Sequence, residues 1–132
     1  MDAREVIALL GLAPHPEGGW YAETWRSGAY ADGRSAGTAI YYLLEAGQES
    51  AWHRVDADET WHFYAGDAVE LRVRTDVGES RHLLSASLRE GGRPQFVVPS
   101  GVWQAARPLG AWSLVGCTVA PGFEFSGFEL DA

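Results

Sequence analysis

The chain has 132 residues, of which 46% are hydrophobic, and a formal net charge of −8, with all ten positive charges on arginine. A chain of this length typically forms one globular domain, so we expect residues 1–132 to fold as a single unit. The acidic balance argues against a nucleic-acid backbone as partner, because that contact requires basic side chains. No apolar run approaches the ~20 residues of a membrane span, and no signal-peptide pattern opens the chain, so we expect a soluble cytoplasmic protein with no membrane partner.

Residues 2–10 are predicted to form one short helix. Asp2 is a suitable N-cap, Glu5 stands at the position that completes a capping box, and Gly11 can end the helix in a left-handed conformation. The apolar residues between them recur at helical spacing, which predicts that one face of the helix packs against the rest of the protein.

Strand-like alternation begins near residue 20. Residues 20–26 alternate in the way expected for a half-buried strand, whereas residues 38–45 are apolar on both faces. In a small protein, a strand with two apolar faces predicts a core on one side and a subunit contact on the other. We therefore expect a homodimer.

The remainder of the chain, as far as residue 130, consists of short strand-like segments separated by turn signals. Residues 69–76 alternate most clearly, and residues 81–88 form a weaker segment. Further short segments follow at 96–98, 102–107, 112–119 and 123–130. Many short strands at this spacing predict an all-β antiparallel sandwich or barrel. Spacing alone leaves an immunoglobulin-like sandwich, a lipocalin-like barrel and a jelly roll open.

The central stretch, residues 47–66, contains two of the four histidines. It matches the first motif of the cupin superfamily, Gly-x5-His-x-His-x3-Glu-x6-Gly, in register. Gly47, His53, Glu59 and Gly66 occupy the motif positions, and Val55 replaces its second histidine.

The second cupin motif, Pro-x-Gly-x2-His, is matched by residues 99–104, with Gln104 at the histidine position. More narrowly, residues 15–19 (HPEGG), 61–67 (WHFYAGD) and 98–105 (VPSGVWQA) resemble a family of small single-domain cupins without assigned function. The resemblance implies an antiparallel jelly roll of the RmlC-like type, preceded by the short helix. It also supports the homodimer. The absence of both lysine and asparagine suggests a GC-rich bacterial source.

The replaced positions leave the chemistry of the site open. Cupins hold a metal ion with three imidazoles and a carboxylate, and here His53, Glu59 and Gln104 remain. This set is a candidate ligand group for a divalent metal, although an amide oxygen is a weak ligand. Without metal, His53 and Glu59 form a candidate acid–base pair, or the three side chains form a structural hydrogen-bonded cluster. Two missing histidines argue against iron-dependent oxygenase chemistry.

Aromatic side chains flank these residues and are predicted to line a ligand pocket. His62 lies on the face of its strand opposite to Glu59, unless a bulge shifts the register. The candidate pocket residues are Gln104, Trp61, Phe63, Trp103, Tyr41 and His62.

Two classes of function follow from this pattern. The first is an isomerase or epimerase acting on a sugar-like molecule, with His53 and Glu59 as base and acid and Gln104 orienting the substrate. The second is a module that binds a sugar, nucleotide-like or aromatic ligand without turnover. A metal-assisted enzyme and a purely structural subunit remain further alternatives.

Three other features favour ordinary structural roles. Glu23 and Arg26 are predicted to be surface charges, although either can reach a pocket mouth. Cys117 lies among apolar residues, which predicts an inert packing residue. Residues 33–37 match Gly-x-Ser-x-Gly, but a strand follows them where a nucleophile elbow requires a helix.

Overall fold

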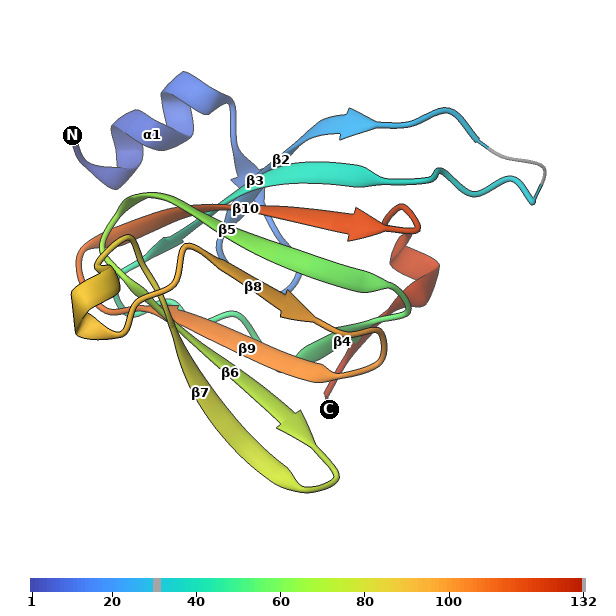
Figure 1. Ribbon diagram of the computed structural model, residues 1–132. Coiled ribbons are helices and arrows are strands. Elements are labelled where there is room, and N and C mark those ends of the chain that lie inside the picture. The colour runs from blue at the N-terminus through green and yellow to red at the C-terminus, as the bar shows by residue number, and fades with distance from the viewer. Residues whose placement is uncertain (30–31, 132) are drawn as a thin grey trace.

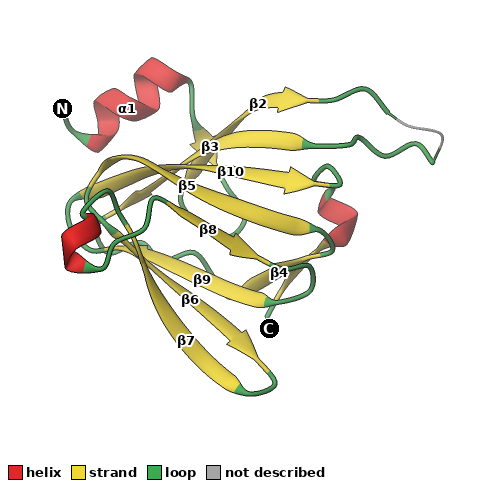
Figure 2. Cartoon of the chain, viewed as in Figure 1, coloured by secondary structure: helices red, strands yellow, loops and turns green. Residues whose placement is uncertain are grey.

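The structure is a computed structural model, and it describes residues 1–29 and 32–131. One α-helix is followed by antiparallel strands and two short 3-10 turns, as Figure 2 shows by colour. In chain order the elements are α1 (Ala3–Leu10), β1 (Ala13–Pro14), β2 (Trp20–Arg26), β3 (Thr38–Glu45), β4 (His53–Val55), β5 (Asp58–Gly66), β6 (Val69–Thr75), β7 (Gly78–Leu84), η1 (Leu88–Glu90), β8 (Gln95–Val98), β9 (Trp103–Pro108), β10 (Trp112–Ala120), η2 (Phe125–Gly127) and β11 (Phe128–Leu130).

The strands form two sheets that enclose the core (Figure 1). The first sheet has the order β1-β2-β3-β10-β5-β8, and the second has the order β11-β4-β9-β6-β7. The strand pairs within both sheets are antiparallel. This arrangement confirms the predicted antiparallel sandwich with one N-terminal helix.

Helix α1 begins and ends as its sequence predicts. The Asp2 side chain accepts a hydrogen bond from the Glu5 backbone N–H at 2.9 Å, and Gly11 closes the helix in the left-handed region with φ 66°. Ala3 and Val6 are buried against Leu43 of β3, so the helix covers part of the outer face of the first sheet. None of the helices within the described ranges is long and apolar enough to cross a membrane.

The core between the sheets follows from strand alternation. On β6, Val69, Leu71 and Val73 are buried, while the charged residues between them face outward. Tyr42 and Leu44 of β3 join the same core from the opposite sheet.

The second apolar face of β3 has an explanation within the chain itself. Leu43 is fully buried beneath α1 and not at a subunit contact. Tyr41 is only half-buried, and its ring meets Tyr64 of β5 edge-on at 6.1 Å. The apolar outer face of β3 therefore supports the homodimer less strongly than the sequence suggests, and the homodimer stays a prediction.

Candidate functional site

A cavity of about 310 Å³ lies between the two sheets. Buried polar side chains line its inner end, and Phe123, Phe125 and Phe128 of the C-terminal segment line one side. Glu23 and Arg26 stand at the more exposed end. The cavity thus combines an apolar wall with a small number of polar groups, as ligand sites in proteins usually do.

The turn at residues 15–19 carries one of these polar groups, Glu17, into the protein. The backbone N–H of His15 donates to the Gly19 carbonyl at 2.9 Å, and Gly19 adopts φ 78°. A Cβ at Gly19 would lie 2.8 Å from the Leu43 carbonyl oxygen, so only glycine lets the turn pack this closely on β3. The Ala51 N–H then donates to the Glu17 carbonyl at 2.7 Å, which ties the turn to the segment before β4.

Glu17 and His53 form a buried ion pair. His53 Nε2 lies 2.8 Å from Glu17 Oε2, and the two side chains are only 2% and 7% exposed. Oε2 is engaged in this ion pair but has no well-aligned hydrogen-bond donor among the residues that the structure describes. The pair therefore holds a buried carboxylate at the cavity whose hydrogen bonding is incomplete.

His53 is held in its charged form by its surroundings. Its Nδ1–H donates to the Ala51 carbonyl at 2.7 Å, which leaves Nε2 facing Glu17. Burial disfavours the charge, but the Glu17 carboxylate, assisted by Glu59 and the Ala51 carbonyl, outweighs burial and raises the pKa of His53 to about 9.

Glu59 enters the same cavity from β5 of the opposite sheet. Burial raises its pKa, with Glu17 reinforcing the shift and His53 and Gln104 opposing it. Trp61 Nε1–H donates to Gln104 Oε1 at 2.8 Å, and Gln104 Nε2–H donates to Glu59 Oε1 at 2.8 Å. Since an indole N–H can only donate, Trp61 fixes the orientation of the amide.

This orientation decides how Gln104 can act. The amide oxygen is occupied by Trp61, and the amide nitrogen faces Glu59, so Gln104 presents no ligating oxygen to a metal ion beside His53 and Glu59. Within residues 1–29 and 32–131, no group of three or more His, Cys, Asp or Glu side chains is arranged to hold a metal. The predicted set of His53, Glu59 and Gln104 therefore does not fit a metal ion.

The structure brings His53 and Glu59 to the cavity, with Gln104 directly behind Glu59. It places the predicted aromatic residues elsewhere. Trp61 is fully buried in the core, and Trp103 lies on the outer surface beneath Arg54, whose guanidinium is 4.7 Å from the ring centroid.

The remaining three predicted pocket residues also lie away from the cavity. Tyr41 is on the outer face of the first sheet, and His62 lies on the same face, within hydrogen-bonding distance (3.0 Å) of Thr118 Oγ1. Phe63 packs at the edge of the core and, with His62, borders a separate shallow depression near Pro94. A bulge does occur in the pairing of β5 with β10, between Leu114 and Val115, but it does not turn His62 inward.

Sequence reasoning missed His15 and Glu17, because it used residues 15–19 only as a motif of family resemblance and not as a source of site residues. The available signal was a histidine and a glutamate beside two glycines, in a motif that already pointed to the family. Glu23 and Arg26, expected to be surface charges, line the open end of the cavity and bond to each other at 2.9 Å. Cys117 also lines the cavity, where burial raises the pKa of its thiol and keeps it protonated.

Known structures share this architecture over the whole chain. A protein from Shewanella oneidensis is 38% identical, with a TM-score of 0.95 over 100% of this chain and 85% of that one. A hypothetical protein from Leishmania major is 34% identical, with a TM-score of 0.90 over 100% of this chain and 88% of that one. No curated protein matches the sequence.

More distant structures show the fold alone. Oxalate decarboxylase from Bacillus subtilis is 12% identical, with a TM-score of 0.67 over 89% of this chain and 29% of that one. A family model described as Cupin superfamily (DUF985) matches residues 4–131. The sandwich, the two motifs and this match together establish that the chain belongs to the Cupin_5 family of the cupin superfamily, whose function is unknown.

Proposed function

We propose that the cavity binds a small sugar-like carbonyl compound and that the protein isomerises or epimerises it by proton transfer. The observation that carries the proposal is the pair of buried glutamates, Glu17 and Glu59, which face one cavity in different electrostatic surroundings. Two carboxyl groups in different surroundings are suited to opposite roles, one as base and one as acid.

Glu17 is the base in this proposal. It is paired with the His53 imidazolium through Oε2, which has no well-aligned hydrogen bond from the described residues. His53, with a pKa of about 9, carries a proton at neutral pH and is not available as a base. The role predicted for His53 thus passes to Glu17, and His53 stabilises the carboxylate.

Glu59 is the acid. Burial raises its pKa, which favours the protonated form, and the bond from Gln104 holds its carboxyl group in place. Glu17 removes the proton from the carbon next to the carbonyl, and the C–H electron pair forms a carbon–carbon double bond. The carbonyl oxygen takes the proton of Glu59, giving an enediol. For an isomerisation, Glu17 returns the proton to the former carbonyl carbon while Glu59, now a carboxylate, takes the proton of the other hydroxyl, where the new carbonyl forms. For an epimerisation, the original carbon receives its proton on the opposite face while Glu59 takes back the proton from the original carbonyl oxygen.

Solvent exchange tests this proposal directly. The protein is incubated in D2O with D-glucose, D-fructose, D-xylose or D-xylulose, and proton NMR follows deuterium entering the carbon next to the carbonyl. Exchange above the protein-free rate with at least one sugar is expected, and the E17Q and E59Q variants should lower it roughly 100-fold or more. E79Q, which changes an exposed glutamate on β7, is the matched control.

Two results would count against the proposal. Exchange that survives in E17Q and E59Q would assign the chemistry elsewhere. Saturable binding of a sugar without exchange would identify a ligand-binding module, the second predicted class, which the Phe123–Phe128 wall also suits.

A further inference from the structure

His15 has no role in the proton transfers described above, although its ring lines the same cavity. Its side chain is 6% exposed. The ring meets Tyr21 edge-on at a centroid distance of 4.6 Å and Tyr42 at 5.6 Å. These contacts hold the imidazole in one orientation, so a polar atom at its edge has a fixed position.

The turn also fixes the tautomer of His15. The backbone N–H of Glu17 donates to His15 Nδ1 at 3.1 Å. A backbone N–H can only donate, so Nδ1 carries no proton and the proton of the neutral ring is on Nε2. Burial lowers the pKa of His15 and His53 lowers it further, against the opposing effect of Glu17, so the ring stays neutral.

His15 Nε2 makes no hydrogen bond to any residue within the described ranges, and the ring of His15 lines the cavity. This donor belongs to a ring that lines the cavity together with Glu17. We infer that His15 donates its Nε2–H to an oxygen of the ligand, and that this oxygen is a carbonyl oxygen at the inner end of the cavity. This inference rests on the proposed function and names the group that the site recognises.

The electrostatics favour a carbonyl over a charged oxygen. A carboxylate at this end of the cavity would face the carboxylate of Glu17, whereas an uncharged carbonyl oxygen accepts the hydrogen bond without that repulsion. A neutral imidazole also polarises a carbonyl without transferring its proton, which leaves the proton transfer to Glu59. His15 thereby complements the two glutamates.

The tautomer is tested first, on the unaltered protein. Long-range 1H–15N correlation spectra of the labelled protein between pH 6 and 8 should show a neutral His15 with its proton on Nε2. A protonated ring, or a proton on Nδ1, would overturn the inference without any variant being made.

The donor is then tested with two probes that differ in one acceptor, cyclohexanone and methylenecyclohexane. Both are small enough for a cavity of about 310 Å³. NMR titration should show that H15F weakens cyclohexanone binding about tenfold and leaves methylenecyclohexane nearly unchanged. H15Q, which restores an N–H donor, should recover most of the cyclohexanone affinity.

The outcomes separate this inference from the proposed function. Equal loss of both probes in H15F, or no cyclohexanone binding to the unaltered protein, would overturn the role of His15. If carbonyl selectivity depends on His15 but no sugar exchanges deuterium, the role of His15 stands and the proton-transfer proposal fails. If exchange proceeds in H15F at the rate of the unaltered protein, the proton-transfer proposal stands and the role of His15 fails.

Discussion

Glu17 shows how a buried carboxylate is tolerated in this protein. Removing a charge from water is costly unless an opposite charge compensates it, and here His53 supplies that charge at 2.8 Å. The compensation is incomplete, because the contact between Oε2 and His53 is not a well-aligned hydrogen bond and no other described residue supplies one. A binding site at Glu17 explains why the protein tolerates an incompletely compensated carboxylate in its interior.

The Glu17–His53 pair makes stability depend on pH. The pKa of His53 rises from its ordinary value of 6.5 to about 9 on folding, so the native state binds more protons than the unfolded state between these values. The stabilisation is complete below pH 6.5 and is lost as pH rises through about 9. We expect the free energy of unfolding to fall by about 3 kcal/mol across this interval.

Urea unfolding at pH 6.5 and pH 9.5 measures this difference. The H53Q variant should lose the His53 contribution to the slope and be less stable near neutral pH, because Glu17 is then buried without its partner. H62Q is the matched control, since His62 lies on the outer face of the sheet. A slope in H53Q equal to that of the unaltered protein would show that His53 is not the titrating group.

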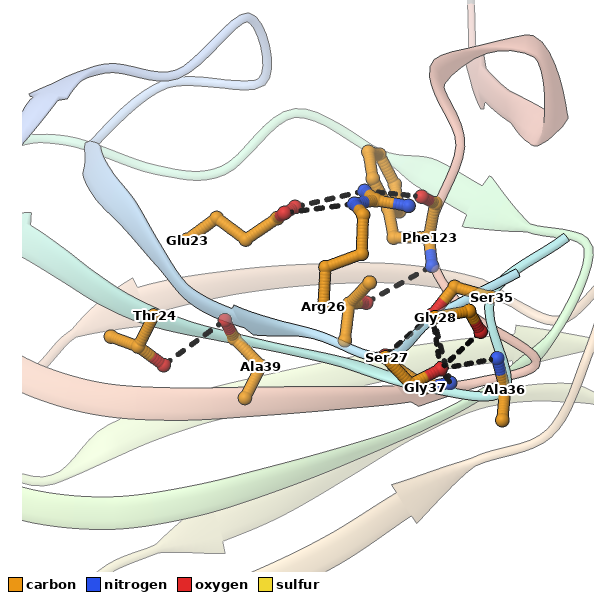
Figure 3. Close-up of polar contacts among 11 residues, drawn as sticks. Glu23, Thr24, Arg26, Ser27, Gly28, Ser35, Ala36, Gly37, Ala39 and Phe123 are labelled. Atoms are coloured by element: carbon orange, nitrogen blue, oxygen red, sulfur yellow. Dashed lines mark hydrogen bonds and ion pairs between the residues drawn. The ribbon is translucent and has the colours of Figure 1, made fainter.

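At the scale of elements, the C-terminal segment, residues 121–131, closes one side of the cavity. It carries the three phenylalanines of the wall, and arginine side chains from other parts of the chain hold its backbone. Arg26 donates to the Phe123 carbonyl at 2.8 Å while its guanidinium bonds the Glu23 carboxylate (Figure 3), and Arg34 donates to the Gly122 carbonyl at 2.9 Å.

Several of these anchors are partly exposed, and exposed ion pairs contribute little to global stability. Figure 3 also shows Ser27 and Ser35, which lie between β2 and β3 and have their hydroxyl oxygens 2.6 Å apart. Ser35 of the Gly-x-Ser-x-Gly string therefore has a structural bonding role. The cavity wall is fixed locally, by contacts that can break without unfolding the sandwich.

Removing the arginine anchors should loosen the wall and leave the sheets intact. We expect R26Q and R34Q, singly and together, to raise amide hydrogen exchange at residues 122–128 by up to roughly tenfold, with about 1 kcal/mol or less lost in global stability. Mass spectrometry of peptic fragments measures the amide hydrogen exchange of residues 122–128 and of the two sheets in one experiment. R107Q, which removes an exposed pair with Glu70 on the second sheet, is the control. Unchanged exchange at residues 122–128 would mean that the phenylalanines alone hold the segment.

At the scale of the whole molecule, the outer face of the first sheet is only partly covered. Helix α1 packs over Leu43, but Tyr64 of β5 and Val97 of β8 remain 52% and 53% exposed. Exposed aromatic and aliphatic side chains on a broad sheet face are typical of an interface, which keeps the predicted homodimer open to a direct test.

Light scattering after size exclusion, at micromolar concentration, gives the mass. A homodimer through this face predicts twice the chain mass of 14.4 kDa for the unaltered protein and a shift towards 14.4 kDa in Y64E and V97E. V77E changes the 98% exposed Val77 beside the β6–β7 hairpin and should leave the mass unchanged. A mass of 14.4 kDa for the unaltered protein would reject the homodimer.

The local features of this protein are determined by its sequence. Alternation on β6 predicts which side chains are buried, because successive residues of a strand face opposite sides. Asp2 and Gly11 predict the limits of α1, because capping involves only neighbouring residues. The two cupin motifs point to the sandwich and to His53 and Glu59, which the structure places at one cavity.

Only the tertiary structure decided which partners these residues meet. Glu17 meets His53 because the turn at 15–19 packs on the segment before β4, a contact between parts of the chain that are distant in sequence. Gln104 faces Glu59 with its nitrogen because Trp61 occupies its oxygen. Local periodicity carries no information about such long-range contacts. For the same reason, it does not distinguish an aromatic residue that packs in the core from one that lines a ligand pocket.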